Sequence, residues 1–239
     1  MEEKTISDIS RFMYLVEASK ANLFRGVQDK DYPLIPSIAR NWEGNLEGLI
    51  RIENQMLDSL RLRAIPYLDY HPHNTWEWLI LGQHYGMPTR LMDWTSNPLA
   101  ALYFACIGDK NKDGVVYLSS GLPKVDTDMI TNPFDIDSEY YISPPHLSTR
   151  IQAQSAFFTI SPNPTIPLKT TIDVRIIVQL KRYLLRDLRH FGVGPAVYFP
   201  GLDGLCKEIG EEGLYEMEEI KVPIRLKRFG KGILRQGRK

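Results

Sequence analysis

A run of polar residues that leads directly into an apolar segment constrains this chain more than any other feature. Residues 83–98 read QHYGMPTRLMDWTSNP, and residues 99–107 are apolar throughout. Asn97 and Pro98 predict a helix start, because Asn caps free N–H groups and proline at the first helical position loses no hydrogen bond. Apolar side chains then follow helical spacing at Leu99, Leu102, Tyr103 and Cys106. A polar strand or turn therefore meets the N-terminus of a buried helix, an end suited to an anion such as phosphate.

Short helices and strands are expected along the rest of the chain without a regular βαβ alternation, which favours an α+β fold. Helices are predicted at 7–20 with Ser7 as the cap, at 46–62, from Asn74 onward, and at 183–191 and 200–209. Strands are predicted at 23–26, 115–118 and 175–180. The proline-rich segment 32–40 (YPLIPSIAR) does not fit a regular helix. We expect one domain over 1–239, with its core at about 20–210.

The charges balance over the whole chain but not along it. The sequence has 29 Lys and Arg against 29 Asp and Glu, which excludes a uniformly basic coat. Six acids lie between Glu208 and Glu219, and eight bases lie between Lys221 and Lys239. This end of the chain is either a solvated tail that folds back on the acids or an arm that binds phosphates of nucleic acid.

Composition and motifs exclude several classes of protein. The hydrophobic fraction of 43% and the charged fraction of 24% are those of a globular domain. Two cysteines suit a reducing compartment, and the chain has neither an apolar leader nor a membrane-length apolar stretch, so we expect a soluble, cytoplasmic protein. Dinucleotide, P-loop, zincin and esterase motifs are absent, and the five histidines are too scattered for a metal site, so we expect no metal.

Each distinctive residue of 83–98 also has a structural explanation. His84 fits a hydrogen-bonded turn, Arg90 and Asp93 fit a local ion pair, and Trp94 fits a core anchor. Thr95 and Ser96 fit helix caps. The density of such residues between glycine and proline nevertheless favours a binding site, because binding residues gather on loops held by rigid elements.

Several blocks of the chain resemble the FRG-domain family, named for a tripeptide of the Phe24-Arg25-Gly26 type. The blocks are LFRG at 23–26, YPLIPS at 32–37 with Arg40, QHYGMPTRLMDWT at 83–95, Asn97-Pro98 and ALYFA at 101–105. Later blocks are RIQAQ at 150–154, FFTI at 157–160 and YFPGLDGL at 198–205. The resemblance covers about residues 20 to 210.

A weaker similarity links the chain to ADP-ribosyltransferases of the cholera-toxin-like group. The Phe24-Arg25-Gly26 strand resembles the arginine-bearing first strand of that group, and 94–105 resembles its Ser-Thr-Ser strand end with the helix that follows. Gln152 and Gln154 fall where the group has Glu-x-Glu, which is a departure because glutamine supplies no anionic charge. The similarity implies a split mixed β-sheet with flanking helices, ADP-ribosyltransferase-like, and NAD as co-substrate.

The similarity also implies roles for individual residues. The expected catalytic residues are Arg25, His84, Asp93 and Gln154. The expected NAD-binding residues are Arg25, Gly26, Thr89, Arg90, Trp94, Thr95, Ser96, Asn97 and Tyr103. Arg25 would clamp the phosphates, and Asp93 would either stabilise the positive charge of the breaking glycosidic bond or hold Arg90. His84 would orient a ribose or act as a base on the acceptor, and Trp94 or Tyr103 would cover the nicotinamide.

Three functions remain open from the sequence. The first is an ADP-ribosyltransferase, a bacterial toxin or antiphage effector that acts on a macromolecule such as RNA or DNA and has a possible antitoxin partner. The second is an NAD glycohydrolase, with water as the acceptor. The third is a non-catalytic module that binds a nucleotide or a partner.

Overall fold

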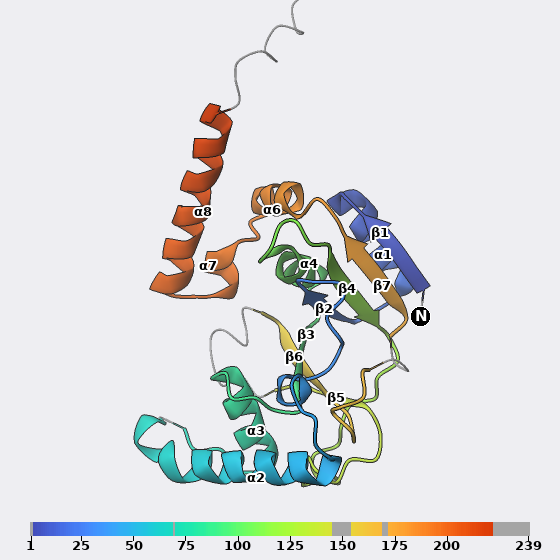
Figure 1. Ribbon diagram of the computed structural model, residues 1–239, viewed down its shortest axis with the longest axis vertical. Helices are drawn as coiled ribbons and strands as arrows, with labels where there is room; N and C mark the ends of the chain where they lie inside the picture. The colour runs from blue at the N-terminus through green and yellow to red at the C-terminus, as the bar shows by residue number, and fades with distance from the viewer. Residues whose placement is uncertain (1, 69, 145–153, 169–171, 222–239) are drawn as a thin grey trace, which may run out of the picture.

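The computed structural model describes residues 2–68, 70–144, 154–168 and 172–221. Over these residues the chain forms one mixed seven-stranded sheet with seven α-helices, which confirms the expected α+β class (Figure 1). The strand order is β1-β7-β4-β2-β3-β6-β5. The strands are β1 (Glu2–Ile6), β2 (Leu23–Val27), β3 (Met92–Thr95), β4 (Gly114–Ser119), β5 (Tyr140–Ile142), β6 (Ala156–Ile160) and β7 (Val174–Val178). The helices are α1 (Ile9–Ser19), α2 (Leu46–Arg63), α3 (Thr75–His84), α4 (Pro98–Cys106), α6 (Lys181–His190), α7 (Pro195–Tyr198) and α8 (Leu202–Lys221).

The middle of the sheet is its weakest junction. Strand β2 pairs with β4 over its whole length, and β3 pairs with β6 over its whole length. Between β2 and β3, however, the only register pair is Phe24 with Thr95. The split sheet expected from the sequence is therefore one continuous sheet, whose two halves are joined at a single position and diverge beyond it.

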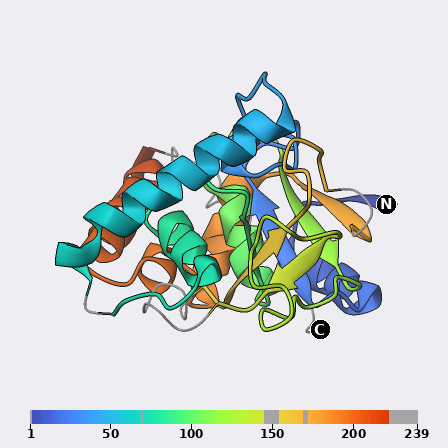
Figure 2. The ribbon, with the colours of Figure 1, turned by 90° about the horizontal axis from the view of Figure 1, so that it is seen from below.

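Two groups of helices cover the two halves. Helices α1, α4 and α6 bury their apolar faces against β2, β4 and β7. Helices α2 and α3 pack with β5 and β6 in a separate cluster (Figure 2). Helix α4 begins where the sequence predicted, with Asn97 accepting hydrogen bonds from the N–H groups of Leu99 (3.0 Å) and Ala100 (3.3 Å).

The chain ends differ from the expectation. Residues 2–6, for which the sequence predicted no strand, form β1, which lies parallel to β7 and adds an edge to the sheet. The helix that follows is capped by Asp8, whose carboxylate accepts from Arg11 N–H at 2.8 Å, and not by Ser7. Within the chain, strands β5 and β6 were not predicted either.

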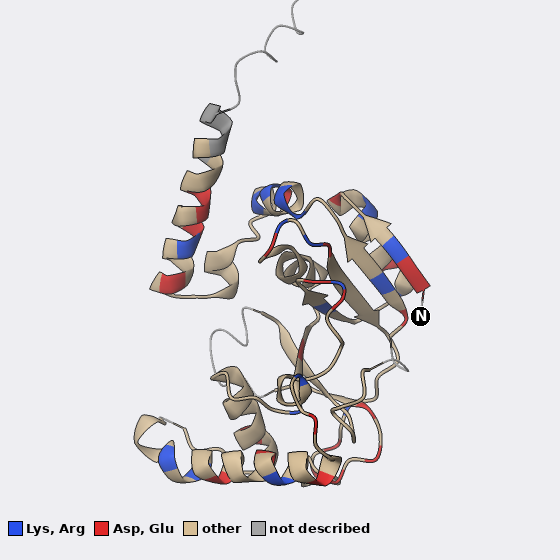
Figure 3. Ribbon diagram, viewed as in Figure 1, with Lys and Arg blue, Asp and Glu red and all other residues tan. Residues whose placement is uncertain are grey.

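Helix α8 is longer than the predicted 200–209 helix and stands away from the sheet (Figure 1). Its acids face the bases of α6 in one place, where Arg189 and Glu211 form an ion pair at 3.0 Å (Figure 3). The basic segment 222–239 lies outside the described residues. In the described parts of the chain, no helix has the length and apolarity needed to cross a membrane.

Candidate functional site

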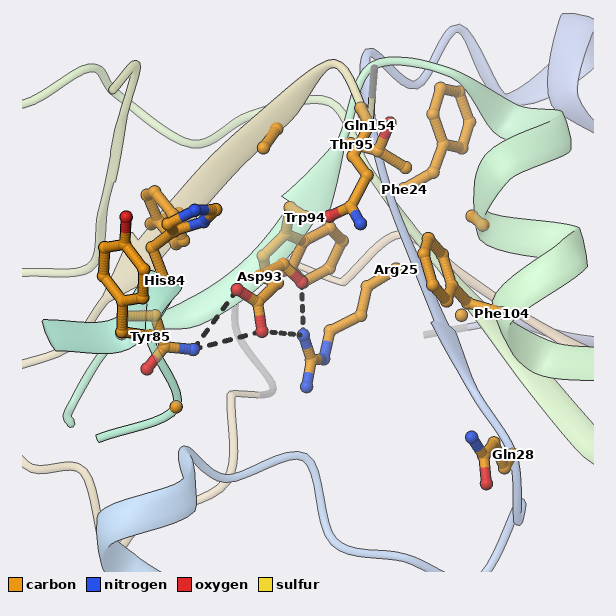
Figure 4. A pocket seen from close by; sticks show the side chains of 16 residues that line it. Phe24, Arg25, Gln28, His84, Tyr85, Asp93, Trp94, Thr95, Phe104 and Gln154 are labelled. Atoms are coloured by element: carbon orange, nitrogen blue, oxygen red, sulfur yellow. Dashed lines mark hydrogen bonds and ion pairs between the residues drawn. The ribbon is translucent and has the colours of Figure 1, made fainter. Parts of the chain in front are cut away.

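A cleft of about 580 Å³ opens where β2 and β3 diverge (Figure 4). Residues of β2, β3 and β6, the end of α3, and α4 surround it, and most of the uncharged ones are aromatic or small. The lining consists of Phe24, Arg25, Gly26, Gln28, Gln83, His84, Tyr85, Gly86, Asp93, Trp94, Thr95, Ala101, Phe104, Gln154, Ala156 and Phe158. All four residues expected to be catalytic are among them.

Arg25 is the cation of the cleft. It projects from β2 toward β3, and its Nη1 donates to the backbone carbonyl of Asp93 and lies 3.9 Å from the Asp93 carboxylate. The side chain is only 13% exposed, and its Nε is buried without a hydrogen-bond partner. Burial lowers the pKa of the guanidinium, and the Asp93 carboxylate partly opposes that effect. A buried, incompletely paired guanidinium is suited to receive an anion.

Among the described residues of the lining Asp93 alone is acidic, and its side chain is 63% exposed. Alternation along β3 explains the exposure, since Met92 and Trp94 on either side are buried. Gln83 Nε2 donates to both carboxylate oxygens of Asp93, at 3.2 and 3.1 Å. Gln83 Oε1 in turn accepts from the Thr89 hydroxyl at 2.7 Å. The carboxylate is thus held in one orientation toward the cleft.

Sequence reasoning missed Gln83 as a site residue. It lies within the polar run, at the last turn of α3, and membership of that run is the one local signal that pointed to it. Only the fold brings it within hydrogen-bonding distance of Asp93.

Thr95 and Gln154 close the end of the cleft next to the β2–β3 junction. The Thr95 hydroxyl donates to the Gln154 carbonyl (2.7 Å) and accepts from Asn97 N–H (2.9 Å). Gln154 Nε2 donates to the Tyr198 carbonyl (3.0 Å). The amide of Gln154 is therefore tied to α7. Gln152 lies outside the described residues.

Aromatic rings supply most of the apolar wall. His84 and Tyr85 form an edge-to-face pair at 4.9 Å between centroids, and Tyr85 is 76% exposed. Trp94 is buried, and its indole N–H donates to the Thr159 hydroxyl at 2.8 Å. The tryptophan is therefore fixed in the sheet and presents an immobile surface to the cleft.

Five of the expected NAD-binding residues do not line the cleft. Gly26, Trp94 and Thr95 do line it, together with Arg25. Ser96 is exposed outside the lining, and Asn97 caps α4. Thr89 is buried and supports Gln83.

Arg90 and Tyr103 occupy the interior, which corrects the expectation that they contact NAD. Arg90 donates from Nε and from its backbone N–H to the carboxylate of buried Glu53, at 2.8 and 2.7 Å, so it does not pair with Asp93. Tyr103 packs against Tyr198, with 5.2 Å between the ring centroids, and burial raises the pKa of the Tyr103 hydroxyl. The helix that starts at Asn97 turns this tyrosine toward the core and away from the cleft.

Comparison with known families supports the resemblance seen in the sequence. Residues 20–114 match the family model of the FRG domain, a range that includes β2, α3, β3 and α4. No curated protein and no solved structure matches the chain. The matched range carries Arg25, His84 and Asp93, whereas Gln154 lies beyond it.

Proposed function

We propose that the cleft binds NAD and that the protein is an ADP-ribosyltransferase of the FRG-domain family. The observation that carries the proposal is the convergence of Arg25, Asp93, His84 and Gln154, from four separate segments, on one cleft in whose described lining Asp93 is the sole acid. An ADP-ribosyltransferase-like fold is part of the same proposal. It is supported by β2, which carries Arg25, and by the neighbouring strand β3, which leads into the buried helix α4.

The lining fits the two chemical parts of a dinucleotide. The guanidinium of Arg25 has a buried Nε without a partner, and phosphate oxygens are the acceptors that match its fork geometry. Phe24, Tyr85 and Phe104 offer ring surfaces for a nicotinamide or an adenine. A volume of about 580 Å³ falls in the range typical of small-molecule sites.

Asp93 is the residue that we assign to the chemistry. NAD supplies a ribosyl–nicotinamide bond whose electron pair leaves with neutral nicotinamide while positive charge develops on the ribose. A carboxylate fixed near that carbon stabilises the charge without reorganising. Gln83 fixes Asp93 in this way, whereas Gln154 is neutral and tied to Tyr198. In this proposal Asp93 takes the part that the glutamate plays in the cholera-toxin-like group.

The acceptor distinguishes the remaining alternatives. A nucleophile on RNA, DNA or protein would take the ADP-ribosyl group and release its proton, with His84 as the nearby base. The eight bases of the C-terminal segment favour a nucleic acid, since they attract phosphates. Such an activity suits a toxin or an antiphage effector, controlled by an antitoxin. With water as the acceptor the same site is an NAD glycohydrolase, and without turnover it is a binding module.

Incubation with NAD labelled in the adenylate part, in the presence of RNA, DNA or a protein mixture, tests the proposal. Label on a polymer supports the transferase, free ADP-ribose supports the glycohydrolase, and neither product leaves only the binding module. Asp93→Asn keeps the shape and removes the charge, so we expect a loss of about 10²-fold or more in turnover.

The matched control is Asp187→Asn, which changes a half-exposed aspartate of α6 that does not line the cleft. Equal turnover by Asp93→Asn and the control would contradict the role of Asp93. Melting temperatures of both variants report whether either change disturbs the fold.

A further inference from the structure

A second, smaller cavity adjoins the cleft on the other side of Arg25. It has a volume of about 230 Å³ and shares Arg25, Gln83, Gly86 and Asp93 with the cleft. Ser37 and Arg40 complete its polar wall. Both come from the proline-rich segment 32–40, to which the proposed chemistry assigns no part.

The charges around this cavity do not balance. Over the described part of its lining, two guanidinium groups, Arg25 and Arg40, face one carboxylate, that of Asp93. That carboxylate already contacts Arg25 and accepts two hydrogen bonds from Gln83. Arg40 is exposed, and no ion pair of Arg40 is found among the described residues.

The two arginines also repel each other. The positive charge of Arg40 contributes to the lowered pKa of Arg25, after the larger effect of burial. An anion between two like charges removes such repulsion and gains two attractive contacts. The cavity is therefore arranged for a ligand with negative charge.

Hydrogen-bond donors are available on both sides of the cavity. Ser37 Oγ accepts from Thr89 N–H at 3.3 Å, and its own O–H is a donor that this bond does not use. Arg25 Nε is buried and unpaired. Met87, Leu91 and Met92 form the rest of the wall, and apolar neighbours strengthen charge-assisted hydrogen bonds by excluding water.

We propose that this cavity binds a phosphate group, held between Arg25 and Arg40 with Ser37 as an added donor. The inference rests on the proposed function, because the ligands expected in the adjoining cleft carry phosphate esters. The phosphate comes either from the dinucleotide or from the backbone of a nucleic-acid acceptor. Fork-shaped guanidinium groups bind phosphate oxygens in pairs, which makes Arg40 the determinant of affinity and Arg25 the group shared with the cleft.

Calorimetric titrations of the full chain test the site with three probes: inorganic pyrophosphate, NAD, and a short RNA without NAD. Arg40→Gln removes the charge at an exposed position and should leave the fold intact. We expect it to weaken pyrophosphate binding about tenfold or more, the size of a lost hydrogen bond to a charged group. Ser37→Ala should weaken binding by a smaller factor.

Arg51→Gln is the matched control, since Arg51 is an exposed arginine of α2 that lines neither cavity. If the loss of pyrophosphate affinity is accompanied by a loss of affinity for NAD, the phosphate belongs to the dinucleotide. If it is accompanied by a loss of affinity for RNA while NAD binds as before, the phosphate belongs to the acceptor. If Arg40→Gln binds all three probes as the control does, or if the unmodified protein does not bind pyrophosphate, the site is refuted.

Turnover of NAD, followed separately by chromatography, keeps the two proposals distinguishable. Binding of pyrophosphate that depends on Arg40, without any NAD turnover, would support the phosphate site and contradict the enzyme. NAD turnover together with pyrophosphate binding that is unchanged in Arg40→Gln would support the enzyme and contradict the phosphate site.

Discussion

Gly26→Ala is the substitution for which the structure makes the strongest quantitative prediction. Gly26 lies on β2 where the strand crosses α4, and a Cβ atom there would lie 1.9 Å from the Ala101 carbonyl oxygen and 2.7 Å from Ala105 N. Both atoms belong to the helix backbone, so no side-chain rotation relieves the overlap. An ordinary contact begins near 3.4 Å, so the strand and helix must separate by about 1.5 Å.

The energetic cost follows from the packing on both sides. Ala100, Ala101 and Ala105 are fully buried, so α4 has no room to retreat. Overpacking in a core costs about 1–3 kcal/mol, and two rigid backbones place this case near 3 kcal/mol. For a chain of this size 1 kcal/mol shifts the melting temperature by about 2–4 °C, so we expect a decrease of about 6–12 °C.

Thermal unfolding followed by circular dichroism measures the effect, with Gly121→Ala as the control. Gly121 is exposed, and a Cβ there meets no atom within 4 Å, while the entropic gain of alanine in the unfolded chain is the same. Because Arg25 precedes Gly26 on the strand, NAD or pyrophosphate binding should weaken as well. Equal melting temperatures for the two variants would refute the account of close strand–helix packing.

Two further predictions concern buried groups. Glu53→Gln leaves the Arg90 charge buried without its charged partner, so the free energy of unfolding measured in urea should fall by about 3–5 kcal/mol. Replacing both residues by Met should lower it by less. A larger decrease in the double variant would contradict this reasoning. Burial raises the pKa of the Cys106 thiol to about 12, so a thiol reagent at pH 8 should modify only exposed Cys206 in the folded protein and both cysteines after unfolding. Rapid reaction of two thiols in the folded state would show that Cys106 is accessible.

Residues with local signals were predicted well, and those without such signals were not. Asn97 with Pro98, and Asn74 with Glu77, carry the start of a helix in neighbouring side chains, and both helices begin there. Strand β1 has no comparable signal. Its residues alternate weakly and are mostly exposed, and they become a strand because β7 offers them an edge.

The candidate site, like the fold, could be predicted only in part. The many polar residues of segment 83–98, beside an apolar helix, indicated that this segment would carry binding residues. Which of them face the cleft depends on which side chains of β3 and α4 point toward the core. Asp93 points outward and Tyr103 points inward. The partner of Arg90 could not be predicted from neighbouring residues either, because Glu53 is 37 residues away in the sequence.

The sequence by itself determined where α3 and α4 start, that the fold is α+β, and that Arg25 and Asp93 belong to unusual polar segments. Only the tertiary structure decided that these two side chains meet, that Gln83 holds Asp93, and that Arg40 faces the same space. The physical reason is distance along the chain. Helix caps act through atoms two or three residues apart, whereas Arg25 and Asp93 are 68 residues apart and meet only because two strands join at one position and then diverge.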